Sequence, residues 1–236
     1  MSKFYNGAVP FLLVNDLRLL SKVEIEDFHN FAERGIVFEV EDLPDFDKKN
    51  IATAPLNRWR EMRAVLSPAF TTKKLSQNQF TDKNVLKMQY MDSVLNESMR
   101  FYTGIVGFVT RRAAKTYEYE GVKIPKGLSV MVPVSYLHQD PEVWREPGNF
   151  DPERFSSENR SRIHPVSFQP FGKGPRECLG RNFALLEMKI MLAKFLANFK
   201  VSVDEEHHKE LIKLGSTFIA SVVPNGVWMK LEKVRA

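Results

Sequence analysis

The sequence predicts a mainly α-helical chain with small β-sheets, an α+β fold class. Three stretches have the apolar spacing of long helices: one between Pro55 and Pro68, one over 82–102 and one over 182–199. Residues 108–134 alternate strand-forming residues with turn residues, which is typical of strands joined by hairpins. Residues 138–177 are rich in proline and glycine, so we expect irregular turns there.

The N-terminal part predicts shorter elements. Residues 4–14 are strand-like, and Asn15-Asp16 caps an amphipathic stretch. A short helix is expected over Ile25–Arg34 because Gly35 follows it as a stop signal. Residues 36–55 predict an irregular acidic connection.

The C-terminal part predicts one helix and one hairpin. The helix over 182–199 contains no glycine or proline and is apolar on almost every side, which is typical of a buried helix. From Val201 the pattern indicates a hairpin with its turn at Pro224-Asn225-Gly226.

Composition narrows the class of protein. The 236 residues are 43% hydrophobic and 27% charged, so the chain can bury a core. It holds no apolar run long enough to span a bilayer, and Met1 does not open a signal peptide. Its 34 Lys and Arg against 29 Asp and Glu give a charge of +5, but the bases are scattered, which does not indicate nucleic-acid binding.

The chain has a single cysteine, Cys178, which cannot form an intrachain disulfide and indicates a reducing compartment. A lone cysteine is often a small buried apolar residue. Here it lies in the loop Phe171-Gly172-Lys173-Gly174-Pro175-Arg176-Glu177-Cys178-Leu179-Gly180, directly before the third long helix. The positive end of that helix and the loop amides favour the thiolate, the form that binds iron.

Other residues of this loop also suit a haem. Gly174 and Gly180 allow close approach to a flat macrocycle and a positive φ. Phe171 would shield the sulfur from water, and Arg176 would pair with a haem propionate.

The spacing F-x-x-G-x-R-x-C-x-G, met in full by this loop, resembles the haem-binding signature of the cytochromes P-450. Neighbouring segments are similar to the microsomal animal type. The resemblance implies haem b (iron protoporphyrin IX) as cofactor. It also implies Cys178 as the metal ligand and catalytic residue, with a binding set of Trp59, Arg63, Phe171, Gly174, Arg176, Cys178 and Gly180.

Two further motifs stand where the resemblance requires them. Trp59 and Arg63 lie one helical turn apart and would hold a propionate together, although an ordinary amphipathic helix would show the same spacing. Glu97 and Arg100 form an E-x-x-R pair, which alone is typical of solvated surface charges. With Arg154, the resemblance implies a structural triad that fastens the turn-rich segment beneath the cysteine loop.

Two positions need separate interpretation. His138 stands among turn residues, so we expect it to cap a turn rather than to act as a second iron ligand.

Many relatives place a further basic residue after the E-x-x-R helix. Arg111 and Arg112 lie near that point of the sequence, but Phe108 lies closer to the position that the base occupies in those relatives. Which residue would make a third contact with a propionate therefore stays open.

The chain is about half as long as is usual in this family. Residues 20–75 resemble the region through the tryptophan helix, and residues 80–102 resemble the E-x-x-R helix and its approach. The A-G-x-[DE]-T pattern of the distal helix occurs nowhere in the sequence. We therefore expect residues 1–236 to form one partial domain of a truncated cytochrome P-450 fold. This domain would be the proximal half, the side that carries the cysteine ligand. We also expect an internal deletion near 75–80 and no membrane anchor.

By resemblance, the function is that of a haem-thiolate monooxygenase, an oxidoreductase that inserts one oxygen atom from O2 into an apolar small molecule. A flavoprotein reductase would be its partner. A basic face for that partner, or an ordinary solvated surface, would comprise Lys173, Arg176, Arg181 and Lys189. The resemblance implies the endoplasmic reticulum membrane as the location. The cytoplasm is the alternative location, because no membrane anchor is evident in the sequence. The alternative is a catalytically inactive shortened isoform, or an incomplete gene model, with weak or no haem binding.

Overall fold

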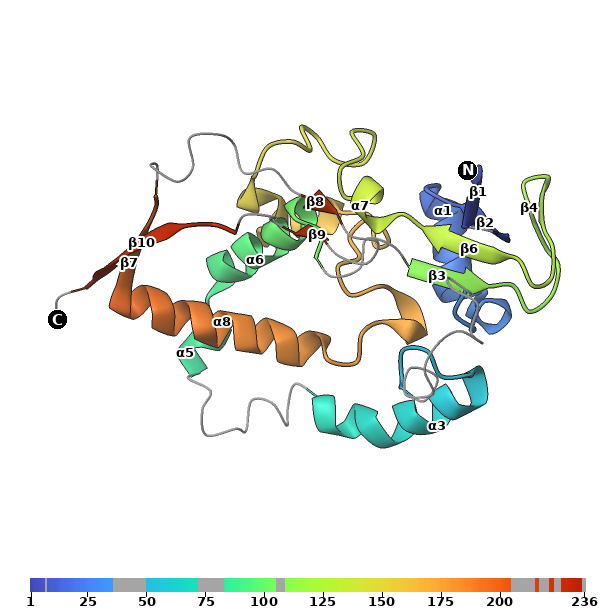
Figure 1. Ribbon diagram of the computed structural model, residues 1–236, viewed down its shortest axis with the longest axis horizontal. Coiled ribbons are helices and arrows are strands. Elements are labelled where there is room, and N and C mark those ends of the chain that lie inside the picture. Colours follow the sequence, from blue (N-terminus) through green and yellow to red (C-terminus); the bar gives the residue numbers. More distant parts are fainter. Residues whose placement is uncertain are drawn as a thin grey trace.

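A mixed four-stranded sheet lies at one end of the molecule (Figure 1). A long helix runs from the middle of the molecule to a pair of antiparallel strands at the other end. The computed structural model describes residues 1–6, 8–35, 50–71, 83–104, 109–204, 215–216, 221–222 and 226–234. Helices and small sheets make up these residues, so the predicted α+β class is confirmed.

The four-stranded sheet has the order β1-β2-β6-β3. Its strands are β1 (Ser2–Asn6), β2 (Val9–Leu13), β6 (Ser129–Val132) and β3 (Val109–Arg112). β2 pairs with β6 in parallel, with Leu12 opposite Val130, whereas the two outer pairs are antiparallel. Every residue of β6 is buried, as expected for a central strand.

Short helical segments cover this sheet and form the core with it. Asp16 caps α1 (Leu17–Ser21) by accepting the Leu19 amide at 2.8 Å, as predicted. The chain continues as a π-helix, η1, and a 3-10 turn, η2, so the single helix expected over Ile25–Arg34 is wrong. Their bounds are Lys22–Glu26 and Phe28–Asn30. The core residues are Val14, Leu19, Leu20, Val23, Phe31, Val109, Ala113, Ile124, Val130, Val132, Val134, Leu137 and Val166.

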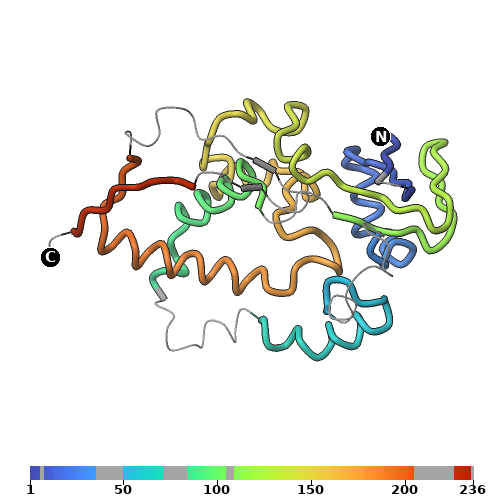
Figure 2. The backbone as a smooth tube through the Cα atoms, viewed as in Figure 1, coloured from blue at the N-terminus to red at the C-terminus, as the bar shows by residue number. Residues whose placement is uncertain are grey.

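The next helix, α3 (Leu56–Leu66), begins after Pro55 and continues into a 3-10 turn, η4 (Ser67–Phe70), as the sequence predicts. It lies along one side of the molecule (Figure 2). Trp59 is its buried residue. The connection 36–49 and the predicted seam near 75–80 lie outside the described residues.

The helix predicted over 82–102 is instead two helices, α5 (Lys83–Leu86) and α6 (Gln89–Phe101). Met88 leaves the helical region, with φ −75° and ψ 80°. The reason is a tertiary contact: Lys189 donates to the Leu86 carbonyl oxygen at 3.3 Å and to Asp92 at 3.0 Å. A buried ammonium thus takes a carbonyl that a continuous helix would use.

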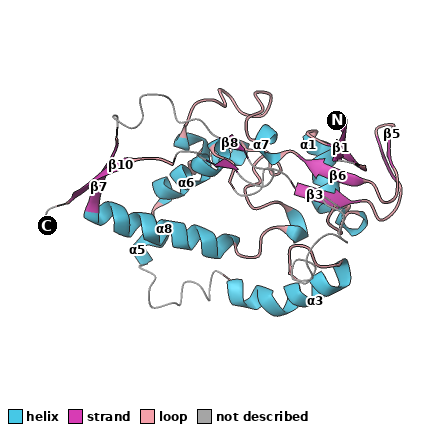
Figure 3. Ribbon diagram, in the orientation of Figure 1, coloured by secondary structure: helices cyan, strands magenta, loops and turns pink. Residues whose placement is uncertain are grey.

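The predicted hairpin and turn regions are confirmed. β4 (Tyr117–Tyr119) and β5 (Val122–Ile124) pair across a turn in which Glu120 and Gly121 both have positive φ. Between β6 and the helix that begins at Arg181 the chain is mostly loop (Figure 3). Its short helical elements are α7 (Val134–Leu137), η5 (Pro152–Phe155), η6 (Arg160–Arg162) and η7 (Gly174–Arg176).

The last long helix, α8 (Arg181–Asn198), forms where it is predicted, but it is not buried. Phe183, Met191 and Leu196 are all exposed, and Lys189 is its buried residue. Within the described residues, few segments pack over its apolar faces.

The C-terminal strands follow α8. β7 (Phe199–Val203) pairs with β10 (Met229–Lys233), and β8 (Gly215–Ser216) pairs with β9 (Ser221–Val222). Paired strands therefore follow Val201 as predicted, but β9 and β10, which flank the expected turn at 224–226, pair with β8 and β7 and not with each other, so the predicted hairpin across that turn is wrong. Pro224 and Asn225 lie outside the described residues. Across the part of the chain that the structure covers, no helix combines the length and hydrophobicity needed to cross a membrane.

Candidate functional site

Cys178 lies at the surface, in the turn that leads into α8. The Cys178 amide donates to the Phe171 carbonyl oxygen at 2.8 Å and closes the loop. The Arg181 amide donates to the Cys178 carbonyl oxygen at 3.4 Å. The thiol is exposed and lies at the positive end of an 18-residue helix. The sulfur is therefore accessible to a metal ion held against this surface.

The loop glycines differ in what they do. Gly172 and Gly174 have positive φ, 75° and 70°. A Cβ at Gly174 would lie 1.9 Å from the backbone oxygen of Glu24, so this glycine lets the loop pack against η1. Gly180 has φ −83°, so the positive φ predicted for it is wrong. Open space lies over its Cα, because apart from its two chain neighbours no described residue comes within 4 Å of an added Cβ.

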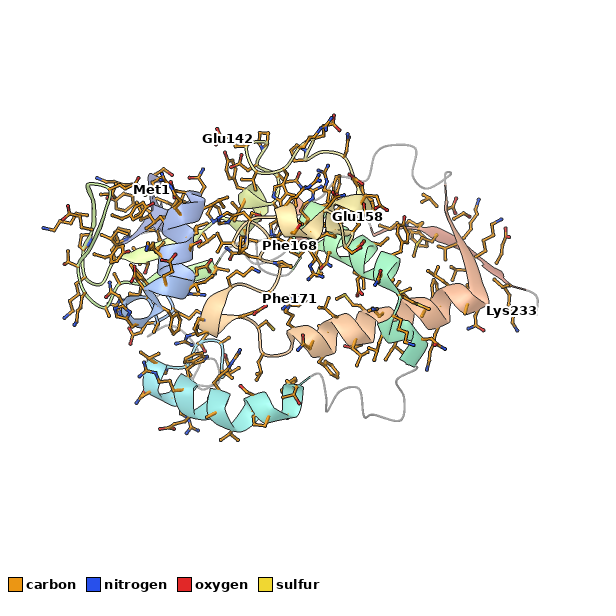
Figure 4. The ribbon with its side chains drawn as sticks, turned by 180° about the vertical axis from the view of Figure 1, so that it is seen from behind. Met1, Glu142, Glu158, Phe168, Phe171 and Lys233 are labelled. Atoms are coloured by element: carbon orange, nitrogen blue, oxygen red, sulfur yellow. The ribbon has the colours of Figure 1, made fainter. Side chains whose placement is uncertain are left out.

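Phe171 lies near the centre of the molecule, close to Phe168 and to the first turn of α8 (Figure 4). A pocket of about 20 Å³ beside it has room for about one water molecule. Its lining residues come from α6, the cysteine loop and α8, and include Asn96, Glu177 and Arg181. This pocket is too small for an organic substrate, and the shielding role of Phe171 stays a prediction.

The α3 helix contacts the cysteine loop through its two predicted residues. The Arg63 Nη1 donates to the Glu177 carbonyl oxygen at 2.8 Å. The indole of Trp59 lies under the guanidinium of Arg176, whose central carbon is 3.9 Å from the ring centroid. This short cation–π contact is buried, which increases its strength. The structure therefore brings Trp59, Arg63 and Arg176 together beside Cys178.

Arg176 belongs to a group of three guanidiniums, Arg34, Arg111 and Arg176, which we call the arginine cluster. Burial lowers the pKa of Arg176 to about 9, and repulsion from Arg34 and Arg111 adds to the effect. Burial likewise lowers the pKa of Arg111 to about 10 and also lowers the pKa of Arg34, whereas Glu24 and Cys178 oppose the change at Arg34. These charges therefore interact with one another and with the cysteine.

Several donors of the arginine cluster have no acceptor among the described residues. The Arg176 Nε donates to the Ala32 carbonyl oxygen at 2.9 Å, but both terminal nitrogens are buried without a partner. The Nε atoms of Arg34 and Arg111 are also buried without one. Unpartnered buried donors on charged groups are costly. An anionic ligand would satisfy them, and a haem propionate has the required charge and acceptors.

Sequence patterns do not single out Arg34, and they leave Arg111 open as a propionate contact. Arg111 is fully buried and donates to Glu24 at 3.4 Å and to the Lys173 carbonyl oxygen at 3.1 Å. The signal was present, since Arg111 follows the E-x-x-R helix and Arg34 precedes a predicted helix stop. Local patterns cannot show that two such arginines meet a third one far along the chain. Phe108 lies outside the described residues.

The structure brings Glu97, Arg100 and Arg154 together. Arg100 donates two parallel hydrogen bonds to Glu97, both 2.8 Å long, and both side chains are fully buried. Arg154 Nε lies 3.5 Å from Glu97 Oε1, which is an ion pair without hydrogen-bond alignment. Arg100 also donates to the carbonyl oxygens of His138, Pro147 and Asn149. These contacts join α6 to the loop that follows α7.

His138 is buried inside this loop. The backbone amide of Gln169 donates to the Nε2 of His138 at 2.9 Å, so Nε2 is the acceptor nitrogen. The proton of the neutral ring is therefore on Nδ1, which faces the Thr103 hydroxyl at 3.2 Å. Burial lowers the pKa of His138 to about 3, and repulsion from Arg100 adds to this. The imidazole is therefore neutral at pH 7, and both of its nitrogens are occupied.

Four basic residues are candidates for an exposed surface that would bind a reductase. This prediction is wrong for two of them. Arg176 and Lys189 are each 4% exposed. Both bind within the protein: Arg176 stacks on Trp59, and Lys189 contacts Asp92. Only Lys173 and Arg181 keep partial exposure, so these two are what remains of that surface.

Comparison with known proteins identifies the family. A profile of the cytochrome P-450 family matches residues 75–227. This span is well over half of the 236 residues, so the chain belongs to the cytochrome P-450 family, whose cofactor is haem. The match begins where the sequence predicts an internal deletion, and that deletion stays a prediction.

Individual relatives agree with the profile. The chain is 50% identical over 119 residues to cytochrome P-450 3A11 of Mus musculus, covering 50% of this chain and 23% of that protein. It is 45% identical over 148 residues to cytochrome P-450 3A31 of Mesocricetus auratus, covering 59% and 29%. Lithocholate 6-beta-hydroxylase of the same animal is 46% identical over 127 residues, covering 54% and 25%. The matched part thus spans less than a third of these relatives.

Proposed function

We propose that this chain binds haem b through Cys178 and the arginine cluster, as the cysteine-side part of a haem-thiolate monooxygenase. The observation that carries this is the pairing, within one loop, of an exposed thiol at position 178 with a buried, unsatisfied guanidinium at position 176. The thiol suits iron as a ligand, and the guanidinium suits a propionate as an ion-pair partner.

The charges of the site support a dicarboxylate ligand. Two buried guanidiniums, those of Arg111 and Arg176, and the partly exposed Arg34 lie close to one another, and Glu24 is the buried carboxylate that pairs with Arg111. Counted together, these four described side chains carry two more positive charges than negative ones. Haem carries two propionates, so its charge complements the site. Trp59 would hold Arg176 in place by stacking, and Arg63 would hold the loop through the Glu177 carbonyl oxygen.

When bound, the haem iron supplies the binding and activation of dioxygen. Cys178 would donate electron density to the iron as a thiolate. The open space over Gly180 would admit the face of the ring, and Phe171 would keep water from the sulfur. Glu97, Arg100 and Arg154 would hold the segment that precedes the loop, a structural role without contact to the ligand or to iron.

The proposed reaction is insertion of one oxygen atom into an apolar small molecule, with electrons from a flavoprotein reductase. Support comes from the relatives, one of which is named as a hydroxylase of lithocholate. We propose the endoplasmic reticulum membrane as its location on the same basis.

Titration of the chain with haem tests this proposal. We expect one haem per chain and a dissociation constant raised at least about tenfold by Arg176→Met, because a charge-assisted contact is lost. Arg162→Met is the matched control, since Arg162 is exposed, and it should bind like the wild type. Equal binding by Arg176→Met, or no binding by the wild type, would contradict the proposal.

A second candidate function is a shortened product without catalysis. The specific observation that favours it is the exposed apolar surface of α8, together with the missing A-G-x-[DE]-T pattern. Such a chain would hold haem weakly and form no product when supplied with reductase and NADPH. Transcript sequencing across the codons for Leu75–Phe80 separates a real short chain from an incomplete gene model.

A further inference from the structure

Glu24 is a fully buried carboxylate next to the arginine cluster. We propose that Glu24 is the internal counter-ion of this anion site: it neutralises one of the three guanidiniums, holds Arg111 against the cysteine loop, and leaves two positive charges for the carboxylates of the ligand. The inference rests on the proposed function for the identity of that ligand. It assigns Glu24 as a positioning residue, since Glu24 acts through Arg111.

The contacts of Glu24 connect it to the loop at three places. Its Oε2 accepts a 2.7 Å hydrogen bond from the Gln169 side chain, two residues before Phe171. Its Oε1 pairs with Arg111 Nη2, which also donates to the Lys173 carbonyl oxygen. Its backbone oxygen occupies the space beside Gly174 where a side chain would begin. Movement of Glu24 would therefore shift the cysteine loop.

The charges around Glu24 offset part of the cost of burying its carboxylate. Burial raises the pKa of Glu24, whereas Arg111, Gln169, Lys173 and Arg34 oppose that change. Removing the carboxylate would leave the repulsion among Arg34, Arg111 and Arg176 without the buried anion that the described residues supply. The apo chain would then depend more strongly on anions from solution, and the ligand-bound chain would depend more strongly on the ligand's carboxylates.

The first test uses the apo chain and inorganic phosphate, so it does not depend on haem. We expect Glu24→Gln to lower the unfolding midpoint, and added phosphate to recover more of the loss than sodium chloride of equal ionic strength. Glu26→Gln is the matched control, because Glu26 lies on the same π-helix but is exposed and pairs with Lys22. A loss that phosphate leaves unchanged would show a packing role only and overturn the proposal.

A charge-restoring variant keeps the test decisive if Glu24→Gln folds poorly. Glu24→Gln combined with Arg111→Met returns the cluster to its original net charge. We expect this double variant to be more stable than Glu24→Gln alone, as a charge-balance role requires. Additive losses would overturn the proposal.

The second test compares haem with haem dimethyl ester, whose propionates are neutral. The wild type should bind haem more tightly, and in Glu24→Gln this preference should grow about tenfold, because one competing negative charge is gone. An unchanged preference, with both porphyrins still bound, would overturn the role of Glu24 and leave the proposed function intact. If neither porphyrin binds to the wild type, the proposed function fails instead.

Discussion

At the residue scale, the guanidinium of Arg176 has fewer hydrogen-bond acceptors among the described residues than it has donors. Its Nε has an acceptor, its flat face covers Trp59, and its two terminal nitrogens have none within the described chain. A guanidinium stays charged near neutral pH even when its pKa falls to about 9. The residue is therefore held ready for an anion, at a cost in stability that binding would recover.

His138 gives a prediction about pH. Its pKa is about 3 in the folded chain and 6.5 when unperturbed, so the folded state binds fewer protons between these values. The free energy of unfolding should therefore fall as the pH drops through this window, by up to about 1.4 kcal/mol per pH unit. Urea unfolding at several pH values checks this. His138→Gln removes the titrating group and should flatten the slope; parallel curves would contradict the prediction.

Gly174 and Gly180 form a matched pair for a stability test. Gly174→Ala forces a side chain onto the Glu24 carbonyl oxygen at a positive φ, so we expect a loss of about 3 kcal/mol or more. Gly180→Ala adds a methyl group in open space at a helix N-cap, and its cost should stay below about 1 kcal/mol. Chemical unfolding of both variants measures the difference. Equal losses would show that the loop does not pack on η1 as described.

At the element scale, the triad joins helix α6 to the irregular loop. Arg100→Met would leave Glu97 buried without its main partner, and we expect a loss of about 3–5 kcal/mol. The double variant Glu97→Met with Arg100→Met removes both charges and should cost less than the sum of the two single changes. A double-mutant cycle by chemical unfolding measures this coupling. Additivity would mean that the pair is energetically independent.

Elements were predictable from the sequence where a local signal decides them. Asp16 caps α1, Pro55 starts α3, and Gly121 turns the β4–β5 hairpin, each through bonds within a few residues. The break between α5 and α6 was not predictable, because Lys189 causes it from about a hundred residues away. The arginine cluster escaped prediction for the same reason, whereas the cysteine loop carries its signature in ten consecutive residues.

At the scale of the whole molecule, α8 is the element least matched to its surroundings. It is apolar on most sides, yet Met191 is 68% exposed and Leu196 is 53% exposed. Exposed apolar surface favours association. We expect light scattering to rise with protein concentration, and Met191→Lys with Leu196→Lys to suppress the rise. Val203→Lys is the control, because Val203 is as exposed as Leu196 but lies outside the helix, in β7. Monomers at every concentration would contradict this.

The proposed haem site as a whole would depend on one bond, between Cys178 and iron. The most direct measurement is the absorption spectrum of the haem-reconstituted chain after reduction and exposure to carbon monoxide. We expect the red-shifted Soret band of a thiolate ligand in the wild type, and its loss in Cys178→Ala, with the fold unchanged by circular dichroism. The same band in both proteins, or a band without thiolate character in the wild type, would contradict the assignment of Cys178 as the iron ligand.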